Sequence, residues 1–322
     1  MTKNYKSNII IAEKGGRNVK VKIVNKRKFI SKIILLMVIV MIALFYVSNK
    51  SKSESKRNNN SIETFEKSSQ EKKDEAENDN EINSNEQNKF INPKITEDTK
   101  ISTTRGLPVL MYHFFYDKEK ESGKDNNFIE VTDFENQMKY LSDEKYYFPS
   151  WQEVEDFIDG KLGLPEKSVV ITIDDGDETF LDYAIPIIKK YNVKVTSFVV
   201  TSWNGDWVPS TYKSSHLDFQ SHSHDMHRAG KNGKGRFINL NYEDGVADVT
   251  KSKEIIGENC NIFCYPFGHF NDTSIKVLKD SGYRLAFTTK GGRVKQGANK
   301  YELPRIRISK GISMTAFKDA VK

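Results

Sequence analysis

The chain has 322 residues, and its formal net charge is +6 at pH 7. Nine Lys and Arg residues and a single acid give residues 1–28 a charge of +8, so the remaining residues together carry −2. The main part of the chain therefore lacks the positive charge that a nucleic-acid-binding protein needs, and we expect no nucleic-acid partner.

An apolar run follows this basic segment. Residues 33–47 are all apolar, and Phe29 and Ile30 extend the run towards the ~20 residues that a membrane-spanning helix needs. We expect residues 29–48 to be a transmembrane anchor behind a basic cytoplasmic tail, residues 1–28, with the rest of the chain outside the cell. The alternative is a cleaved signal peptide, which would make the protein secreted, although no small-x-small cleavage site follows the run.

Residues 49–104 are mostly Lys, Glu, Asn and Ser, with few apolar side chains. Such a segment buries too little surface to offset its conformational entropy. It predicts a disordered linker between the membrane anchor and a folded domain over residues 105–322.

The folded part predicts strands that alternate with helices. The run at 169–173 is continuously apolar, which is typical of a strand buried on both faces of a parallel sheet. The capping-box patterns that begin at Thr132 and Ser150 predict two helix starts, and Gly160 ends the second helix. The other expected strands are 107–115, 193–200, 262–265, 283–289 and 303–308, and the other expected helices are 178–191, 242–257, 272–280 and 315–321. This order predicts an α/β fold with its active site at the carboxyl ends of the strands.

Two polar clusters follow the apolar segments. Asp174 and Asp175 directly follow the predicted strand at 169–173, and His222 and His227 lie about fifty residues later. Two carboxylates and neighbouring imidazoles can bind a divalent metal and leave one carboxylate to act as a base. Adjacent strand residues point to opposite sides, so a turn at Gly176 is needed to bring both carboxylates together. An aspartate pair that caps the following helix is the alternative.

The motifs Thr172-Ile173-Asp174-Asp175-Gly176 and Ser221 to His227 resemble those of carbohydrate esterase family 4, the NodB-type polysaccharide deacetylases. The five-residue spacing from His222 to His227 is similar to the subgroup that deacetylates poly-β-1,6-N-acetylglucosamine. The resemblance implies a distorted (β/α) barrel of the NodB type. It also implies that Asp175, His222 and His227 bind a divalent metal, zinc first with nickel or cobalt as alternatives, and that Asp174 is the base.

Leu110-Met111-Tyr112-His113 resembles the last motif of that family, placed ahead of the aspartates as in the circularly permuted poly-N-acetylglucosamine deacetylases. The resemblance makes His113 the candidate general acid. A strand histidine that only packs in the core is the alternative.

Further residues are candidates for the substrate groove. Residues 263–268 resemble the family's third motif, which implies that Tyr265, Pro266, Phe267 and Gly268 line the groove and that a backbone N–H there contributes to an oxyanion hole. The usual arginine of that motif is absent. Arg305 could orient Asp174 in its place, or it could form a surface ion pair. The remaining candidates are His224, which faces substrate or solvent, and Trp203 and Trp207, which stack on a sugar or only pack.

Together these residues predict an enzyme that removes N-acetyl groups from an extracellular N-acetylglucosamine polymer, most similar to the poly-β-1,6-linked case. The expected partners are the acetylated polysaccharide and the membrane, and no protein partner follows from the sequence. A peptidoglycan N-acetylglucosamine deacetylase, an O-acetyl esterase and an inactive glycan-binding surface protein are the alternatives.

Overall fold

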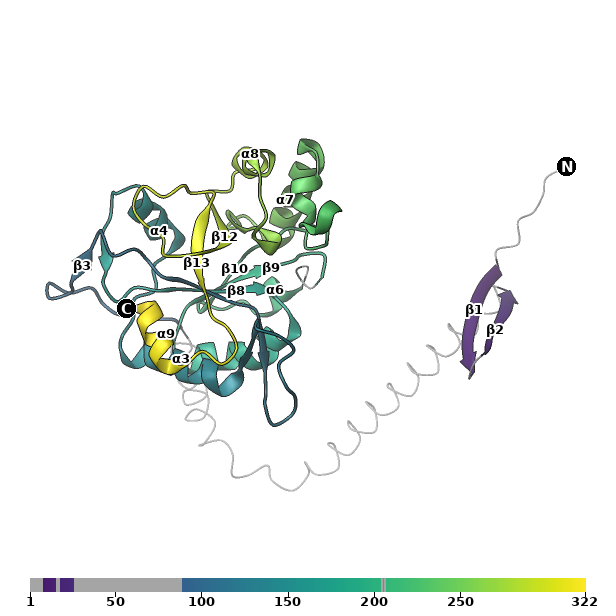
Figure 1. Ribbon diagram of the computed structural model, residues 1–322, viewed down its shortest axis with the longest axis horizontal. Coiled ribbons are helices and arrows are strands. Elements are labelled where there is room, and N and C mark those ends of the chain that lie inside the picture. The colour runs from purple at the N-terminus through teal and green to yellow at the C-terminus, as the bar shows by residue number, and fades with distance from the viewer. Residues whose placement is uncertain (1–7, 16–17, 26–88, 204, 206) are drawn as a thin grey trace, which may run out of the picture. The chain divides into compact units, whose positions relative to one another are not determined.

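The structure is a computed structural model that describes residues 8–15, 18–25, 89–203, 205 and 207–322 (Figure 1). The chain divides into two units, Met1–Ile82 and Asn83–Lys322. In the first unit, Asn8–Gly15 (β1) and Asn18–Asn25 (β2) form an antiparallel hairpin that the sequence analysis did not predict. Among the described residues, no helix is long and apolar enough to cross a membrane. The predicted anchor at 29–48 lies outside them.

In the second unit, seven parallel strands form a closed barrel. They are β4 (Val109–Tyr112), β8 (Val170–Asp175), β9 (Val195–Val199), β10 (Leu217–Ser221), β11 (Ile262–Cys264), β12 (Leu285–Gly291) and β13 (Leu303–Arg307). Each strand pairs with the next one in the sequence, and β13 closes the barrel on β4, where Ile306 pairs with Leu110. The expected α/β barrel is confirmed.

Helices surround the barrel (Figure 1). They are α3 (Val131–Asp143), α4 (Trp151–Ile158), a π-helical turn (Phe180–Ala184) that runs into α5 (Ile185–Lys190), α6 (Val208–Thr211), α7 (Tyr242–Ile256), α8 (Asp272–Asp280) and α9 (Met314–Val321). The capping box at Ser150 is present as predicted. The predicted box at Thr132 is wrong, because α3 begins earlier with Glu130 as its N-cap, whose carboxylate accepts a hydrogen bond from the Asp133 N–H.

Short strands and turns complete the domain. They are β3 (Ile101–Ser102), β5 (Phe114–Tyr116), β6 (Phe128–Glu130), β7 (Leu164–Pro165) and 3₁₀ turns at Lys231–Gly233, Arg236–Asn239 and Pro266–Gly268. β3 pairs with β7, and β5 pairs with β6.

Alternation along the strands sorts their side chains into layers. Leu110 of β4 and Ile171 of β8 pack outwards with α3, α5 and α9. Their neighbours Val109 and Val170 belong to a different cluster, which joins residues from six barrel strands to α4 and therefore fills the barrel interior. Thr172 and Asp174 follow Val170 at the same period of two, so both are expected to face inwards. The interior thus becomes polar towards the carboxyl ends of the strands.

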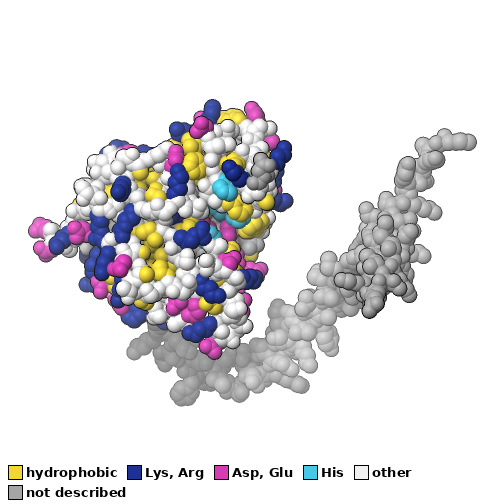
Figure 2. All heavy atoms as spheres, viewed as in Figure 1, with side chains coloured by type: hydrophobic (Ala, Val, Ile, Leu, Met, Phe, Trp, Pro, Cys, Tyr) yellow, Lys and Arg dark blue, Asp and Glu magenta, His cyan; other side chains and the backbone are white. Residues whose placement is uncertain are grey.

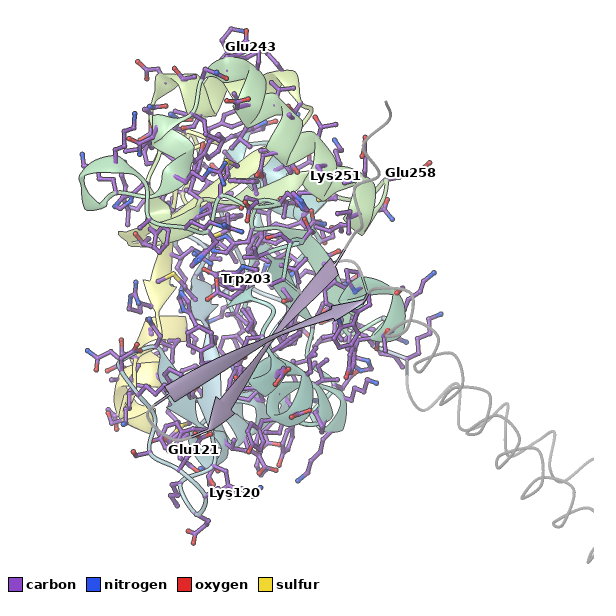
Figure 3. The ribbon with its side chains drawn as sticks, turned by 90° about the vertical axis from the view of Figure 1, so that its right-hand side faces the viewer. Lys120, Glu121, Trp203, Glu243, Lys251 and Glu258 are labelled. Carbon is purple, nitrogen blue, oxygen red and sulfur yellow. The ribbon has the colours of Figure 1, made fainter. Side chains whose placement is uncertain are left out.

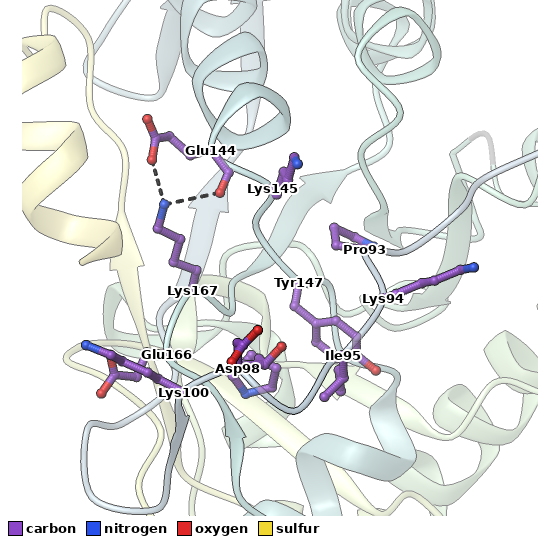
Figure 4. A pocket seen from close by; sticks show the side chains of 12 residues that line it. Pro93, Lys94, Ile95, Asp98, Lys100, Glu144, Lys145, Tyr147, Glu166 and Lys167 are labelled. Atoms are coloured by element: carbon purple, nitrogen blue, oxygen red, sulfur yellow. Dashed lines mark hydrogen bonds and ion pairs between the residues drawn. The ribbon is translucent and has the colours of Figure 1, made fainter.

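The segment from residue 89 to 102, which we call the belt, is ordered, so the predicted linker is wrong for these residues. Asn92 exchanges two hydrogen bonds with the backbone of Phe148, and Asn192 exchanges two with the backbone of Ile91. The Phe90 ring lies 5.8 Å from the ring of His216, which directly precedes β10. The belt therefore crosses the amino ends of the barrel strands. A pocket of about 700 Å³ opens there between the belt and residues 144–147 and 165–167 (Figure 4).

Candidate metal centre and active site

The three predicted metal ligands meet at the carboxyl ends of β8 and β10. The Nε2 atoms of His222 and His227 lie 3.4 Å and 3.3 Å from Oδ1 of Asp175. This oxygen is buried and has no hydrogen-bond partner in the described part of the chain. An orphaned carboxylate oxygen that faces two imidazole nitrogens fits a divalent cation. Figure 2 shows histidine side chains reaching the surface beside hydrophobic ones.

A tight backbone turn brings the two aspartates into one site. Asp175 has φ of +73° and Gly176 has φ of +69°. At Gly176 a Cβ atom would lie 2.7 Å from Cγ1 of Val199, so only glycine fits. The left-handed turn takes Asp175 out of the strand alternation, which would otherwise point it away from Asp174. The predicted need for a turn is confirmed.

The two histidines are held in the form that a metal requires. Nδ1 of His222 lies 2.7 Å from the Cys264 carbonyl oxygen, so this nitrogen donates and Nε2 is left to bind. Burial lowers the pKa of His222 to about 3, and burial also lowers the pKa of His227. Burial, with the charge of Asp174 second, raises the pKa of Asp175 to about 8. A bound cation would offset this cost of ionising Asp175.

Asp174, His222 and Cys264 also converge. Burial raises the pKa of the Cys264 thiol, and both oxygens of Asp174 are engaged by another residue. This second group is therefore a poor metal site, and the donors fit the predicted set of Asp175, His222 and His227.

Arg305 holds Asp174. Its two terminal nitrogens each donate to one oxygen of Asp174 at 2.7 Å, and its Nε donates to the Thr288 carbonyl at 3.1 Å. Arg305 is only 1% exposed, so its interpretation as a surface ion pair is wrong. Burial by itself would raise the pKa of Asp174, but the guanidinium outweighs this effect and holds the pKa below its usual range. The geometry agrees with the predicted orienting contact.

His113 reaches the same site from the end of β4. Its Nε2 lies 3.8 Å from Oδ2 of Asp174. Burial lowers the pKa of His113, although Asp174 opposes this shift, so the free ring is neutral at pH 7. The side chain is 15% exposed, which leaves a path to substrate. The permuted motif therefore places a histidine beside the aspartate pair, and its role as acid stays a prediction.

The turn at Tyr265 to Gly268 offers one free backbone donor. The Tyr265 N–H donates to the Phe287 carbonyl, the Gly268 N–H donates to the Tyr265 carbonyl, and Pro266 has no N–H. Within the described residues, the Phe267 N–H has no backbone acceptor. Among the residues of this turn, the Phe267 N–H is therefore the candidate oxyanion donor. The Phe267 ring centroid lies 4.4 Å from that of His227.

The remaining predicted residues divide. The exposed ring of Trp203 meets His227 edge-on at 5.1 Å, on the face that Figure 3 turns to the viewer. Trp207 is also exposed and packs on Tyr212 instead. Nδ1 of His224 lies 3.0 Å from the Thr201 hydroxyl, and His224 belongs to neither of the two metal-type groups among the described residues.

A parallel α/β barrel that carries a candidate Asp/His cation site beside a buried carboxylate is typical of metal-assisted hydrolases. The comparisons with known proteins specify the class. The family model for polysaccharide deacetylase matches residues 161–286. A poly-beta-1,6-N-acetyl-D-glucosamine N-deacetylase of Staphylococcus aureus (strain MRSA252) is 30% identical over 212 residues, which cover 61% of this chain and 72% of that protein.

Solved structures share the fold. The Streptococcus pyogenes deacetylase PplD in complex with acetate has a TM-score of 0.59 at 24% identity, covering 67% of this chain and 98% of that one. IcaB from Ammonifex degensii has a TM-score of 0.55 at 25% identity, covering 67% of this chain and 95% of that one. The chain belongs to the polysaccharide deacetylase family, so the predicted family and enzyme class are confirmed.

Proposed function

We propose that this protein is a metal-dependent N-deacetylase of an extracellular N-acetylglucosamine polymer, with poly-β-1,6-N-acetylglucosamine as its substrate. The observation that carries the proposal is that Asp175, His222 and His227 lie together. Beside them lie His113 and the proposed base Asp174, which Arg305 holds by hydrogen bonds. The name of the Staphylococcus aureus relative supports the choice of polymer.

The metal would be held by Asp175, His222 and His227. Zinc, or nickel or cobalt in its place, would supply a Lewis acid that activates water. Asp174 stays ionised because Arg305 lowers its pKa, so it is available to accept a proton from the attacking water. The Phe267 N–H would donate to the oxyanion that develops on the N-acetyl carbonyl.

The proton balance gives His113 its role. Hydrolysis of the amide takes one proton from water and delivers one to the departing amine. His113 is neutral in the free protein, so it must first gain the proton that it donates. Asp174 is 3.8 Å away and can pass on the proton taken from water. The pair then transfers one proton from water to the amine, and the products are acetate and a glucosamine residue.

Two exposed aromatic rings, Trp203 and Phe267, would bind the polymer. They are 46% and 42% exposed and both lie against His227. Aromatic faces beside a polar centre suit the apolar face of a sugar ring. A linear glycan lying across His227 could therefore contact both rings.

We propose further that residues 29–48 anchor the protein in the cell membrane as a single span, with the deacetylase domain outside. The apolar run and the preceding charge of +8 support this location.

Acetate release from defined oligomers tests the proposed activity. The protein should release acetate from β-1,6-linked N-acetylglucosamine oligomers and generate one free amine for each acetate, more slowly from β-1,4-linked oligomers. Acetate release from an O-acetylated glycan, with no release from either N-acetylated oligomer, would indicate an O-acetyl esterase. No release from any of the three glycans by the metal-loaded protein would favour the glycan-binding alternative.

A further inference from the structure

The loop between the two histidine ligands is held by contacts from several directions. Ser223 has φ of +77°, and its N–H donates to the Ser221 hydroxyl at 3.1 Å. The Thr201 N–H donates to the Ser223 carbonyl, and the Ser202 N–H donates to the His224 carbonyl. These contacts fix one side of the loop against the end of β9. Within the five-residue spacing between the ligands, the backbone N–H groups of His224 and Asp225 come next, and both need hydrogen-bond acceptors from another part of the chain.

Asp248 of α7 satisfies both of them. Its Oδ1 accepts the His224 N–H at 2.7 Å, and its Oδ2 accepts the Asp225 N–H at 2.8 Å. Each carboxylate oxygen thus takes one donor, and charge-assisted hydrogen bonds of this length are roughly twice as strong as neutral ones. His227 lies only two residues beyond the second donor, so the carboxylate acts on the loop close to a metal ligand.

Helix α7 is itself fixed against the barrel. Ser252, one turn after Asp248 on the same face, hydrogen-bonds the Ser221 hydroxyl at 2.7 Å, and Ser221 directly precedes His222. A Cβ at Gly245 would lie 3.0 Å from Cγ2 of Val277 on α8, so the two helices approach closely. The α7 face therefore contacts both the residue before the first ligand and the loop before the second.

The carboxylate of Asp225 is also held from outside the loop. It pairs with Arg228 at 2.6 Å and with Arg236 at 2.9 Å. These pairs are exposed and contribute little alone. Asp248 is the acceptor that orders the loop backbone, because it takes the two backbone N–H groups directly.

From these contacts we propose that Asp248 is a positioning residue for the metal centre, setting the place of His227 relative to His222 through the loop backbone. This inference rests on the proposed metal site. Among the described residues, Asp248 accepts no hydrogen bond from the side chains of His222 and His227, and it acts before metal binds by holding the two imidazoles at the spacing that one cation needs.

Zinc affinity of the full-length protein tests the proposal. Asp248→Asn keeps the size of the side chain but replaces one acceptor oxygen with an NH₂ group, which cannot accept from the second N–H. We expect zinc, measured by competition with a chromophoric chelator, to bind about 10- to 100-fold more weakly to this variant than to the wild type, the range typical for partners that orient metal ligands. The matched control is Glu254→Gln, which removes a negative charge from exposed α7 surface and should leave the affinity unchanged.

Equal zinc affinity in Asp248→Asn and wild type would overturn the proposal. Weak or absent zinc binding by the wild type would instead contradict the metal site itself, so the two failures are distinguishable. If Asp248→Asn does not fold, amide hydrogen exchange of the metal-free wild type decides. The His224 and Asp225 amides should be protected, and exchange as fast as in an unstructured peptide would refute a preformed loop.

Discussion

Arg305 shows how a single buried side chain joins fold and chemistry. Arg305 lies in the barrel interior towards the carboxyl ends of the strands. It donates hydrogen bonds to Thr172 and Asp174 of β8 and to the Thr288 carbonyl of β12. A contact between Arg305 and Asp174 was a candidate in the sequence analysis, but the burial of Arg305 was not predicted. Burial changes its energetic role, because removing one partner of a buried ion pair leaves the other charge uncompensated.

Replacing Arg305 should therefore cost stability as well as activity. Arg305→Met is expected to lower the free energy of unfolding by about 3–5 kcal/mol, measured by urea denaturation of the metal-free protein. The control is Lys167→Met, which breaks an exposed pair with Glu144 and should cost about 1 kcal/mol or less. Equal losses in the two variants would contradict the structural role of the buried pair.

His113 should matter for turnover and not for folding. Loss of a general acid typically lowers the rate by ~10²- to 10⁴-fold. We expect His113→Ala to lower kcat on an N-acetylglucosamine oligomer by such a factor, while zinc content and melting temperature stay near those of the wild type. Near-native turnover in this variant would remove His113 from the mechanism and require a different proton donor.

At the scale of elements, the long apolar strands and the capped helices were predictable and the polar strand was not. Helix α8 has the predicted bounds, and β8 is the predicted buried strand, which begins one residue later and ends two residues later than expected. β10 was missed because Asp218 and Gln220 interrupt its apolar pattern. Asp218 accepts from the Trp151 indole at 2.8 Å, and the side-chain oxygen of Gln220 accepts the backbone N–H groups of Asn261 and Ile262 at the start of β11. These partners are distant in sequence, so no local pattern reveals them.

The candidate site was predictable where a motif carries it and unpredictable where the backbone or a long-range contact does. The motifs led to Asp175, His222, His227 and His113. The left-handed conformation of Asp175 and the contacts of Asp248 depend on tertiary packing. The belt was mistaken for linker because polar asparagines hold it by hydrogen bonds to a distant backbone, which composition cannot show.

The belt makes stability sensitive to pH through His216. This buried ring packs on Phe90 and lies near Lys189, Lys194 and the Ser214 hydroxyl. Burial lowers its pKa, and the two lysines lower it further. The unfolded chain therefore binds the His216 proton more readily, and the free energy of unfolding should fall as pH drops below about 6.5.

Replacing His216 tests whether this residue lowers the free energy of unfolding at acidic pH. The loss in unfolding free energy between pH 7.5 and pH 5, measured by urea denaturation without metal, should be smaller in His216→Gln than in wild type. Other histidines and carboxylates titrate in both proteins, so only the difference between the two is informative. Identical pH dependence would show that His216 is not held neutral by its surroundings.

At the scale of the whole molecule, the belt and the candidate active site lie at opposite ends of the barrel. The belt packs at the amino ends of the strands, whereas Asp175 and His222 follow the carboxyl ends of β8 and β10. If residues 29–48 form the proposed anchor, the tether joins the domain on the face away from the substrate groove, which would leave the groove open to a polymer.

Protease treatment of intact cells tests the proposed location. Cleavage in the polar segment ahead of residue 89 should release a soluble fragment that retains deacetylase activity, because the belt and barrel are packed and resist proteolysis. A cytoplasmic protein serves as the control for cell integrity. Complete protection of the domain in intact cells, with cleavage only after lysis, would mean that the domain faces the cytoplasm.

Stoichiometric reconstitution with metal tests the central claim most directly. The metal-free protein is titrated with zinc, and acetate release from a β-1,6-linked N-acetylglucosamine oligomer is followed at each step. The account predicts no release without metal, a rise that saturates at about one zinc per chain, and no recovery in Asp175→Asn or His222→Ala. Full activity in the metal-free protein, or equal recovery in these two variants, would contradict it.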